Sequence, residues 1–302
     1  MSKIYKLAAI DIGSNAVRLL ISSVTENNAK TIFKKISLVR VPLRLGEDVF
    51  TKGKISVKNF KKLQKTIKAF KILMQMHKVY MFKCVATSAM REAKNSSKII
   101  EEIFKKFNFK IDLISGKKEA LIIANVFLKN SDTSINNYLY VDVGGGSTEL
   151  NVISKNKIVK SKSFKIGTVR SLNNSIKTKD WYSFKDWIKK SSEVYKDIMV
   201  IGSGGNASKI LNISGKSTNQ IIDYESLEKI NSLINSMSFE ERVFKLQLNV
   251  DRADVIVPAL NIYLKSLEYS NSKSFIVPRI GLADGVIRQI YDNKDEAQFL
   301  DW

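Results

Sequence analysis

The sequence of 302 residues contains one cysteine, one histidine and three prolines. A single cysteine, Cys84, excludes an internal disulfide and a multi-cysteine metal site, and we expect it to be a small buried residue on a strand. The histidine, His77, follows an amphipathic stretch, where it is expected to be a charge partner at a helix C-terminus rather than a catalyst. With so few prolines and no low-complexity tract, long disordered linkers are not expected.

The sequence also lacks an apolar run of the roughly 18 residues that a membrane span needs. Its first residues, MSKIYKLAAIDIG, enter a strand-like segment without a small-residue cleavage site, so we expect a cytoplasmic protein with no membrane partner. Apolar residues make up 44% of the chain and charged residues 26%, which is typical of a globular protein. The length is sufficient for two cores.

Acidic residues are scarce in the first half of the chain. Residues 1–130 hold 27 Lys and Arg against 9 Asp and Glu, whereas residues 131–302 hold 23 against 20. Such a field attracts nucleic acid, an acidic membrane or polyphosphate without selecting among them. Most of the lysines recur singly on amphipathic stretches such as 57–76, which is typical of solvated helix faces. No recognition-helix, RRM or zinc signature is present, so a specific nucleic-acid partner is not expected.

Apolar periodicity predicts an α/β protein. Strand-like runs occur at about 5–12, 17–24, 31–39, 79–86, 110–114, 138–143, 148–154, 158–164, 198–201 and 274–278. Helical spacing occurs at about 56–76, 97–107, 117–129, 181–196, 205–212, 224–236 and 251–267.

One internal similarity bears on the domain organisation. The stretches 7–21 and 139–153 share an order of apolar strand, Asp, apolar residue, Gly-rich turn and second apolar strand. Their aspartates, Asp11 and Asp142, are too far apart for a solenoid repeat, so the similarity indicates two copies of one device, each opening its own domain.

We therefore predict two domains, 1–128 and 129–302, with a cleft between them. The polar stretch 129–137 is the best candidate for their junction. The last helix of the C-terminal domain could also pack on the N-terminal domain.

The two glycine turns contain residues suited to binding phosphate and a metal ion. Glycine permits φ > 0 and a close approach of the backbone, so that N–H groups can point at an anion, and Ser14 and Ser147 add hydroxyl donors. Mg²⁺ binds through one or two carboxylates together with phosphate oxygens. On the outgoing strand, Glu149 could share such an ion with Asp142 or position a water.

Two further stretches have a composition suited to phosphate. At 86–96, Thr87, Ser88 and Arg91 follow a predicted strand and could donate to one anion, although the same residues also form a good helix N-cap. At 202–207, GSGGNA fits three interpretations: a dinucleotide fingerprint, a phosphate- or nucleotide-facing loop, or a simple strand-to-helix turn.

Together these stretches resemble the exopolyphosphatase and guanosine pentaphosphate phosphohydrolase (Ppx/GppA) family of the actin, Hsp70 and sugar-kinase superfamily. The matching stretches, in the family's order, are IDIGSNAVRLLI, ATSAMREAKN, VDVGGGSTEL, KIGTVRSL, IGSGGNASKI, SFEERVFKLQLNVDRADVIVPAL and GLADGVI. The resemblance implies two RNase H-like domains of a short family member. It also implies Mg²⁺-dependent phosphoanhydride hydrolysis in the interdomain cleft, and a homodimer.

The resemblance also supplies a catalytic base, Glu119, which lies in the segment ISGKKEALII at the start of a helix. From the residues alone, Glu119 is a first-turn acid favoured by the helix dipole. The chain departs from the family where Leu121 replaces a common arginine, where GGNASK replaces GGTAR and where GLADG replaces GLREG. These departures leave the predicted catalytic residues unchanged and bear on the choice of substrate.

The resemblance and the residue chemistry together predict the site. Glu119 is expected to activate water, with Glu149 and Arg91 completing the catalytic set. Asp142, Glu149 and Asp11 are the predicted ligands of Mg²⁺. Phosphate binding is assigned to Gly13, Ser14, Asn15, Arg18, Gly144, Gly145, Gly146 and Ser147, and a nucleotide-side loop to Gly202, Ser203, Gly204 and Gly205.

We expect a hydrolase that releases terminal phosphate from polyphosphate, guanosine pentaphosphate or both. An alternative is an ATP-dependent kinase or ATPase of the same superfamily, with 202–207 taking the nucleotide. Another is a non-catalytic sensor that binds guanosine alarmones or polyphosphate, which the altered loops motivate. A general nucleic-acid binder, motivated by the positive first half, ranks last.

Overall fold

The computed structural model describes residues 3–27, 30–130, 137–195 and 197–300. The chain forms two compact units, Met1–Ser115 with Leu282–Trp302 (unit 1) and Gly116–Gly281 (unit 2). This division differs from the predicted boundary at 128/129, because the helix that begins at Gly116 packs on strands of unit 2. Most of the predicted junction, 131–136, lies outside the described residues.

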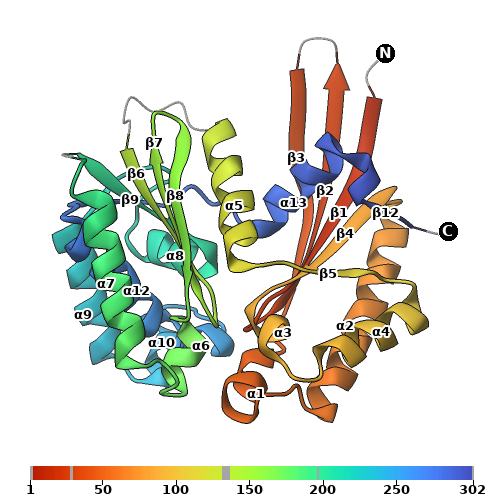
Figure 1. Ribbon diagram of the computed structural model, residues 1–302, viewed down its shortest axis with the longest axis horizontal. Coiled ribbons are helices and arrows are strands. Elements are labelled where there is room, and N and C mark those ends of the chain that lie inside the picture. The colour runs from red at the N-terminus through yellow and green to blue at the C-terminus, as the bar shows by residue number, and fades with distance from the viewer. Residues whose placement is uncertain (1–2, 28–29, 131–136, 196, 301–302) are drawn as a thin grey trace. The chain divides into compact units, whose positions relative to one another are not determined.

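Unit 1 is built on one mixed sheet (Figure 1). Its strands are β1 (Lys3–Ile12), β2 (Val17–Asn27), β3 (Lys30–Val41), β4 (Met81–Ala86), β5 (Ile111–Leu113) and β12 (Gln298–Phe299). Its helices are α1 (Leu45–Lys52), α2 (Val57–Met76), α3 (Ser88–Glu92), α4 (Ser96–Phe107), α13 (Leu282–Asp292) and the 3₁₀ turn η1 (Lys294–Glu296). The strand order is β12-β4-β1-β2-β3, and β5 also pairs with β4.

Helices cover both faces of this sheet. On one face, Ile10 and Leu19 belong to a buried cluster with Leu63 of α2 and Ile103 of α4. On the other face α13 lies against β1 and β4, and the ring of its Tyr291 contacts β1 and β3. Cys84, in the middle of β4, is fully buried, and burial raises the pKa of its thiol.

Unit 2 is built on a second mixed sheet, of order β10-β11-β9-β6-β7-β8. Its strands are β6 (Asn137–Val143), β7 (Thr148–Ser154), β8 (Lys157–Phe164), β9 (Ile198–Ser203), β10 (Ile222–Asp223) and β11 (Ser274–Ile276). Its helices are α5 (Gly116–Asn130), α6 (Thr168–Leu172), α7 (Thr178–Ser192), α8 (Gly204–Ile213), α9 (Tyr224–Ser236), α10 (Phe239–Phe244), α11 (Val250–Ala253) and α12 (Ile256–Ser270).

The alternation of β6 divides its side chains between two helical layers. Leu139 and Val141 enter the large cluster formed with α7, α9 and α12, while Tyr138 and Tyr140 face the other way and contact Phe127 of α5. A strand with apolar residues on both faces is typical of a central position in a sheet covered on both sides. Unit 2 is therefore a three-layer structure with α5 on one side.

The two units repeat one topology. In each, three consecutive strands form an antiparallel meander and a fourth strand pairs parallel with the first: β4 with β1, and β9 with β6. The first hairpins also close alike, since Gly13 N–H donates to the Ala16 carbonyl at 3.1 Å and Gly144 N–H donates to the Ser147 carbonyl at 2.9 Å. The internal similarity seen in the sequence thus corresponds to a repeated structural unit.

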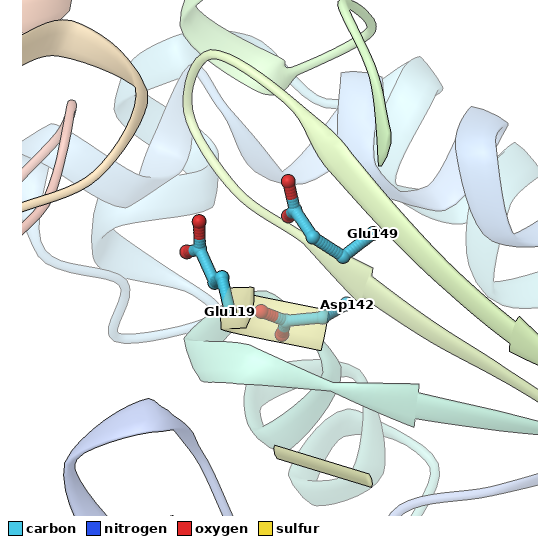
Figure 2. Close-up of side chains that lie close together, drawn as sticks. All are labelled: Glu119, Asp142 and Glu149. Carbon is cyan, nitrogen blue, oxygen red and sulfur yellow. The ribbon is translucent and has the colours of Figure 1, made fainter. Parts of the chain in front are cut away.

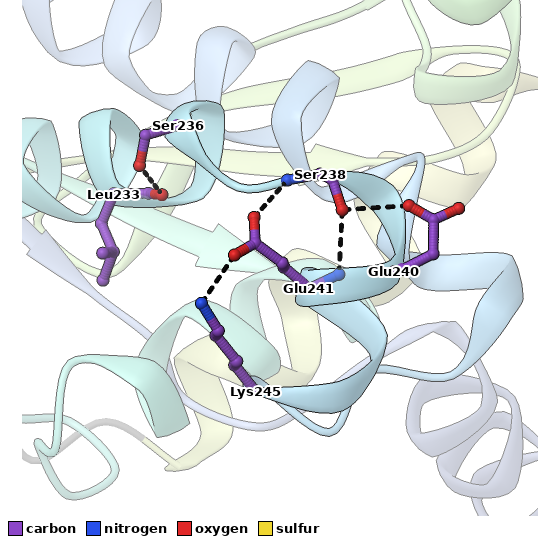
Figure 3. A network of polar contacts seen from close by, with 6 residues as sticks. All are labelled: Leu233, Ser236, Ser238, Glu240, Glu241 and Lys245. Carbon is purple, nitrogen blue, oxygen red and sulfur yellow. Dashed lines mark hydrogen bonds and ion pairs between the residues drawn. The ribbon is translucent and has the colours of Figure 1, made fainter.

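Several helices begin at side chains that satisfy their first N–H groups. Ser56 Oγ accepts from Asn59 N–H at the start of α2, and Asp223 accepts from Ser226 N–H at the start of α9. Figure 3 shows the capping box of α10, in which Ser238 Oγ accepts from Glu241 N–H and the Glu241 carboxylate accepts from Ser238 N–H.

The predicted helix at 251–267 is two helices, α11 and α12. Pro258 has no N–H to donate to the carbonyl of Asp254, so a continuous helix would lack that hydrogen bond. The helices α1, α6, α10 and α13 were not among the stretches predicted from helical spacing, whereas α3 begins after Thr87, where the sequence offered an N-cap. None of the helices in the described ranges is long and apolar enough to cross a membrane.

Candidate active site

The β6–β7 hairpin places two carboxylates side by side. Asp142 and Glu149 are directly opposite each other in the antiparallel ladder, where Cβ atoms of paired residues lie about 5 Å apart. The turn between them is Gly144–Gly145–Gly146–Ser147. Both side chains therefore lie at the end of the sheet where the glycine turn projects.

Helix α5 brings a third carboxylate, Glu119, to the same place. Its first turn is fixed to the sheet by Asn151 of β7, whose Nδ2 donates to the Ala120 carbonyl at 3.0 Å within the core. Gly116 allows this approach, because a Cβ at that position would collide with Ser163 Oγ of β8. Figure 2 shows Glu119, Asp142 and Glu149 gathered near one another, each from a different element.

The three carboxylates form one acidic cluster. One carboxylate oxygen of each lies within 4.8 Å of the others, and Glu119 and Glu149 are buried. At an effective dielectric constant of about 20, two unit charges about 4 Å apart repel by about 4 kcal/mol. A hard divalent cation would relieve this repulsion, and carboxylate oxygens are the ligands that Mg²⁺ prefers. The donor set fits such an ion.

Serine hydroxyls fix the orientation of two of these carboxylates. Glu149 Oε1 accepts from Ser147 Oγ at 2.7 Å and from Ser163 Oγ at 2.9 Å. Asp142 Oδ1 accepts from Ser203 Oγ at 2.7 Å. Hydrogen bonds to a carboxylate stabilise its charged form, so these serines favour the ionised state that metal binding requires.

The carbonyls of the glycine turn are held by α6. Thr168 N–H donates to the Gly144 carbonyl at 3.0 Å and Val169 N–H to the Gly145 carbonyl at 2.8 Å, while Arg170 Nε donates to the Gly146 carbonyl at 2.9 Å. Peptide carbonyl and N–H groups point in opposite directions. The N–H groups that follow these carbonyls in the chain, those of Gly145, Gly146 and Ser147, are thereby turned away from α6 and suited to an anion, whereas Gly144 N–H donates to the Ser147 carbonyl.

The stretch 202–207 joins the end of β9 directly to the start of α8, beside Asp142. Gly204 has φ +91°, and a Cβ there would lie 3.2 Å from Asp142 Oδ1. Gly202 lies against the Phe275 ring and Gly205 against the guanidinium of Arg252. Packing therefore accounts for two of the glycines, and Ser203 and Gly204 are the loop residues in contact with the acidic cluster.

The equivalent turn of unit 1 differs in charge. Arg18 occupies the position of Glu149 and forms an ion pair with Asp11 at 2.9 Å. Burial raises the pKa of Asp11, although Arg18 opposes the shift. The structure thus gives Asp11 a cationic partner within its own unit, and its predicted role as a metal ligand stays a prediction.

The hydroxyl and carbonyl groups of this turn have defined partners. Ser14 Oγ lies 2.7 Å from Ser88 Oγ and accepts from Ala89 N–H at 3.2 Å, which joins the turn to the start of α3. The carbonyls of Ser14 and Asn15 accept from Gly46 N–H and Arg44 N–H, at the start of α1. As in unit 2, the carbonyls of the turn face the helix that follows the third strand.

Arg91, on α3, points one nitrogen to the backbone. Its Nη1 donates to the Ile114 carbonyl at 2.7 Å. Its backbone N–H donates to the Thr87 carbonyl, as in the first turn of a helix. Ser88 and Arg91 thus belong to the short helix that contacts the Ser14 turn.

A model of the Ppx/GppA phosphatase family matches residues 20–294. The chain belongs to the Ppx/GppA phosphatase family. This confirms the resemblance carried by the seven sequence stretches. Among solved structures, an exopolyphosphatase from Cytophaga hutchinsonii superposes with a TM-score of 0.83 at 22% identity, covering 95% of this chain and 98% of that one. The Aquifex aeolicus Ppx/GppA family member superposes with a TM-score of 0.76 at 26% identity, covering 96% and 99%.

The curated relatives that the chain matches are longer proteins. A bifunctional 3-dehydroquinate synthase/phosphatase of Fusobacterium nucleatum is 28% identical over 95% of this chain and 47% of its own length. A guanosine-5'-triphosphate,3'-diphosphate pyrophosphatase of Vibrio parahaemolyticus is 24% identical over 94% of this chain and 59% of its own. The chain therefore spans about half the length of the curated relatives that it matches.

Within this family fold, sequence reasoning missed several residues of the site. Ser163 was not predicted, and Ser203 was assigned only to the nucleotide-side loop. Both bind the acidic cluster, but they reach it through the pairing of β8 and β9 with the hairpin, which no local pattern encodes. Arg170 and Arg252 hold the two glycine loops from helices that follow later in the chain. For Ser203, a hydroxyl at the end of a strand parallel to β6 is the one signal that could have been used.

Proposed function

We propose that the protein is a Mg²⁺-dependent phosphoanhydride hydrolase that releases terminal phosphate from inorganic polyphosphate, guanosine pentaphosphate or both. The observation that carries this proposal is the cluster of Glu119, Asp142 and Glu149 beside a glycine turn whose carbonyls accept hydrogen bonds from α6. Membership of the Ppx/GppA phosphatase family and relatives named exopolyphosphatase support it.

In the proposed reaction, Asp142 and Glu149 would hold Mg²⁺, and the N–H groups of Gly145, Gly146 and Ser147 bind phosphate oxygens. When bound, the ion neutralises charge on the phosphate oxygens. The Glu119 carboxylate accepts a proton from a water whose oxygen attacks the terminal phosphorus. The P–O anhydride bond breaks, and the shortened chain leaves as an anion in line with the attack.

The residues of unit 1 complete the proposal. Ser14 and its turn bind a second stretch of phosphate, with Arg18 and Arg91 supplying cationic contacts. This role requires the two glycine turns to face one cleft, which is the arrangement predicted from the repeated hairpin. We further propose a cytoplasmic homodimer without a specific nucleic-acid partner, to be measured by sedimentation and by cell fractionation.

The decisive experiment measures phosphate release from long polyphosphate, guanosine pentaphosphate and ATP, each with Mg²⁺ and with chelator. The proposal expects release from at least one of the first two substrates, complete loss with chelator, and little release from ATP. ATP turnover alone would replace it with the ATPase alternative. Mg²⁺-dependent binding of the first two substrates without any release would replace it with the sensor.

A further inference from the structure

Helix α2 presents a surface of one charge sign. It has six lysines and no carboxylate. Its buried side packs Leu63, Ile67, Phe70 and Met74 into the core of unit 1. The exposed lysines are Lys58, Lys61, Lys62, Lys65 and Lys68. Steps of three and four residues place them along one side of the helix, and at about 1.5 Å per residue they extend over roughly 15 Å.

This concentration of like charge is unusual within the molecule. Lysines at i and i+4 on one helix repel each other, as Lys58 and Lys62 do here. Other exposed helices pair lysines with acids at this spacing: Lys105 with Glu101 on α4, and Lys245, the C-cap residue of α10, with Glu241 (Figure 3). In the part of the chain that the structure describes, no ion pair joins the five α2 lysines to a carboxylate.

Two more exposed lysines, Lys54 and Lys94, extend the surface at the N-terminal end of α2. The segment before α2 is fastened to the segment after α3, because the Asn95 side chain accepts from Ile55 N–H at 3.0 Å and donates to the Ile55 carbonyl at 2.9 Å. Lys94 N–H donates to the Gly53 carbonyl at 2.9 Å. Both lysines are therefore held beside the start of the helix.

The same end of α2 connects to the phosphate-binding turn of unit 1. Helices α1 and α3 contact each other, and both bind Ser14, through Gly46 N–H at 2.8 Å and Ala89 N–H at 3.2 Å. α1 leads directly into the segment that carries Lys54, and α3 leads into Lys94. A row of lysines thus runs, within unit 1, from the ends of the two short helices whose starts contact the Ser14 turn to the middle of α2. The carboxylate of Asp48 at the start of α2 is bound by Ser56 N–H and by the Asn59 side chain.

We propose that Lys54, Lys94 and the five exposed α2 lysines, here called the lysine track, bind the part of a linear polyphosphate that extends beyond its terminal phosphates. The inference rests on the proposed function and deepens it. A polyanion with one charge per unit matches a single row of lysines in charge and shape. Guanosine pentaphosphate is too short to occupy the Ser14 turn and the roughly 15 Å of α2 together, so the track favours long polyphosphate.

The test compares two charge-matched variants of the full chain. The track variant carries Lys58→Gln, Lys61→Gln, Lys65→Gln and Lys68→Gln, which preserve helix propensity. The control variant carries the same substitution at four exposed lysines of unit 2, Lys157, Lys179, Lys189 and Lys229. Binding of fluorescent long-chain polyphosphate is measured by anisotropy over a range of salt concentrations, and KM is measured for long polyphosphate and for guanosine pentaphosphate.

The track variant is expected to bind long polyphosphate about tenfold or more weakly, with a shallower dependence of affinity on salt. Its KM for long polyphosphate rises in parallel, while its KM for guanosine pentaphosphate changes by less than twofold. If the control variant binds long polyphosphate equally weakly, the loss of affinity comes from the change in net charge, and the track is overturned. Unchanged binding by the track variant would do the same.

Two further outcomes separate the track from its premise and from other partners. Suppose that the wild type binds polyphosphate without releasing phosphate, and that the track variant loses this binding. The proposed hydrolysis then fails and the track stands. If the track variant loses binding to duplex DNA or to phosphatidylserine vesicles but keeps its affinity for polyphosphate, the surface serves that other polyanion and the inference is overturned.

Discussion

Glu149 lies directly opposite Asp142 across the β6–β7 ladder, and Arg18 takes the equivalent place opposite Asp11 across the β1–β2 ladder. The two hairpins share backbone geometry but not charge. Two carboxylates in one pair require a cation for neutrality, whereas Asp11 and Arg18 neutralise each other at 2.9 Å. The turn in unit 2 therefore has the excess of negative charge that favours a metal ion, whereas the carboxylate of the turn in unit 1 has a cationic partner of its own, and metal binding by Asp11 stays a prediction.

Replacing Glu119 with Gln should remove the base and preserve shape. Because a general acid–base group typically contributes about 10² to 10⁴-fold, kcat should fall by about that factor while KM changes little. Phosphate release under saturating Mg²⁺ measures both. Glu225→Gln changes a first-turn acid of α9 that, unlike Glu119, is exposed, and it should leave kcat unaltered. An unchanged kcat in Glu119→Gln would remove this residue from its proposed role.

Replacing Asp142 with Asn should separate metal binding from folding. Asn keeps an oxygen that can accept from Ser203 but removes one of three clustered charges. In chelator, the variant should have a free energy of unfolding equal to or above that of the wild type, because repulsion is reduced. Added Mg²⁺ should raise Tm of the wild type and have little effect on the variant. A Mg²⁺-induced rise in Tm that is the same in both proteins would contradict the assignment of Asp142 as a ligand.

Replacing Arg18 with Met should destabilise the protein in a pH-dependent way. Burial raises the pKa of Asp11 above its ordinary value of 3.8, so the folded protein keeps this proton to a higher pH than the unfolded chain does. Stability from Asp11 is thus lost as pH rises through the folded pKa. Without Arg18 the pKa rises further and the loss grows.

We expect Arg18→Met to be about 1–3 kcal/mol less stable than the wild type at pH 7, a figure reduced for the 34% exposure of Arg18. Near pH 4 the difference in the free energy of unfolding between Arg18→Met and the wild type should nearly vanish. Urea unfolding at several pH values measures it. The double variant Asp11→Asn with Arg18→Met should recover most of the stability at pH 7, and a deficit that is independent of pH would show that the ion pair is not its cause.

The sequence predicts the long elements because their patterns are local. The limits of α2 and α9 agree with prediction to within about one residue, since each combines helical apolar spacing with an N-capping side chain, Ser56 or Asp223. The short helices α1, α3 and α6 span eight residues or fewer, too few to show a period. The helix break before Pro258 carries a local signal that was overlooked.

The candidate site likewise combines features that a local sequence pattern predicts with features that depend on how distant segments pack. The pairing of Asp142 with Glu149 follows from a hairpin whose turn glycines are visible in the sequence. The place of Glu119 beside them depends on how α5 packs on β7, and only family resemblance indicated it. The hydrogen bonds of Ser163 to Glu149 and of Ser203 to Asp142 were not predicted, because they depend on strand pairings that join residues 14 and 61 positions apart.

Gly116 has no contact with substrate in the proposed reaction. Replacing it with Ala should nevertheless lower activity, because the added Cβ displaces elements that carry the site. The added Cβ collides with Ser163 Oγ and would lie 2.5 Å from Ser163 Cβ, so either α5 or β8 must move. Both carry parts of the site, since α5 bears Glu119 and Ser163 Oγ binds Glu149 at 2.9 Å. Overpacking of this kind typically costs about 1–3 kcal/mol.

The Gly116→Ala protein should therefore lose about that much stability in urea unfolding and show a lower kcat with a weaker response to Mg²⁺. Gly281→Ala is the matched control, because a Cβ there has no atom within 4 Å among the described residues. Adding Ser163→Gly to Gly116→Ala removes both colliding atoms and should restore stability without restoring the hydrogen bond to Glu149. If the double variant regains stability but not kcat, Ser163 orients the carboxylate; if Gly116→Ala matches the wild type in both measurements, the contact between α5 and β8 does not set the position of Glu119.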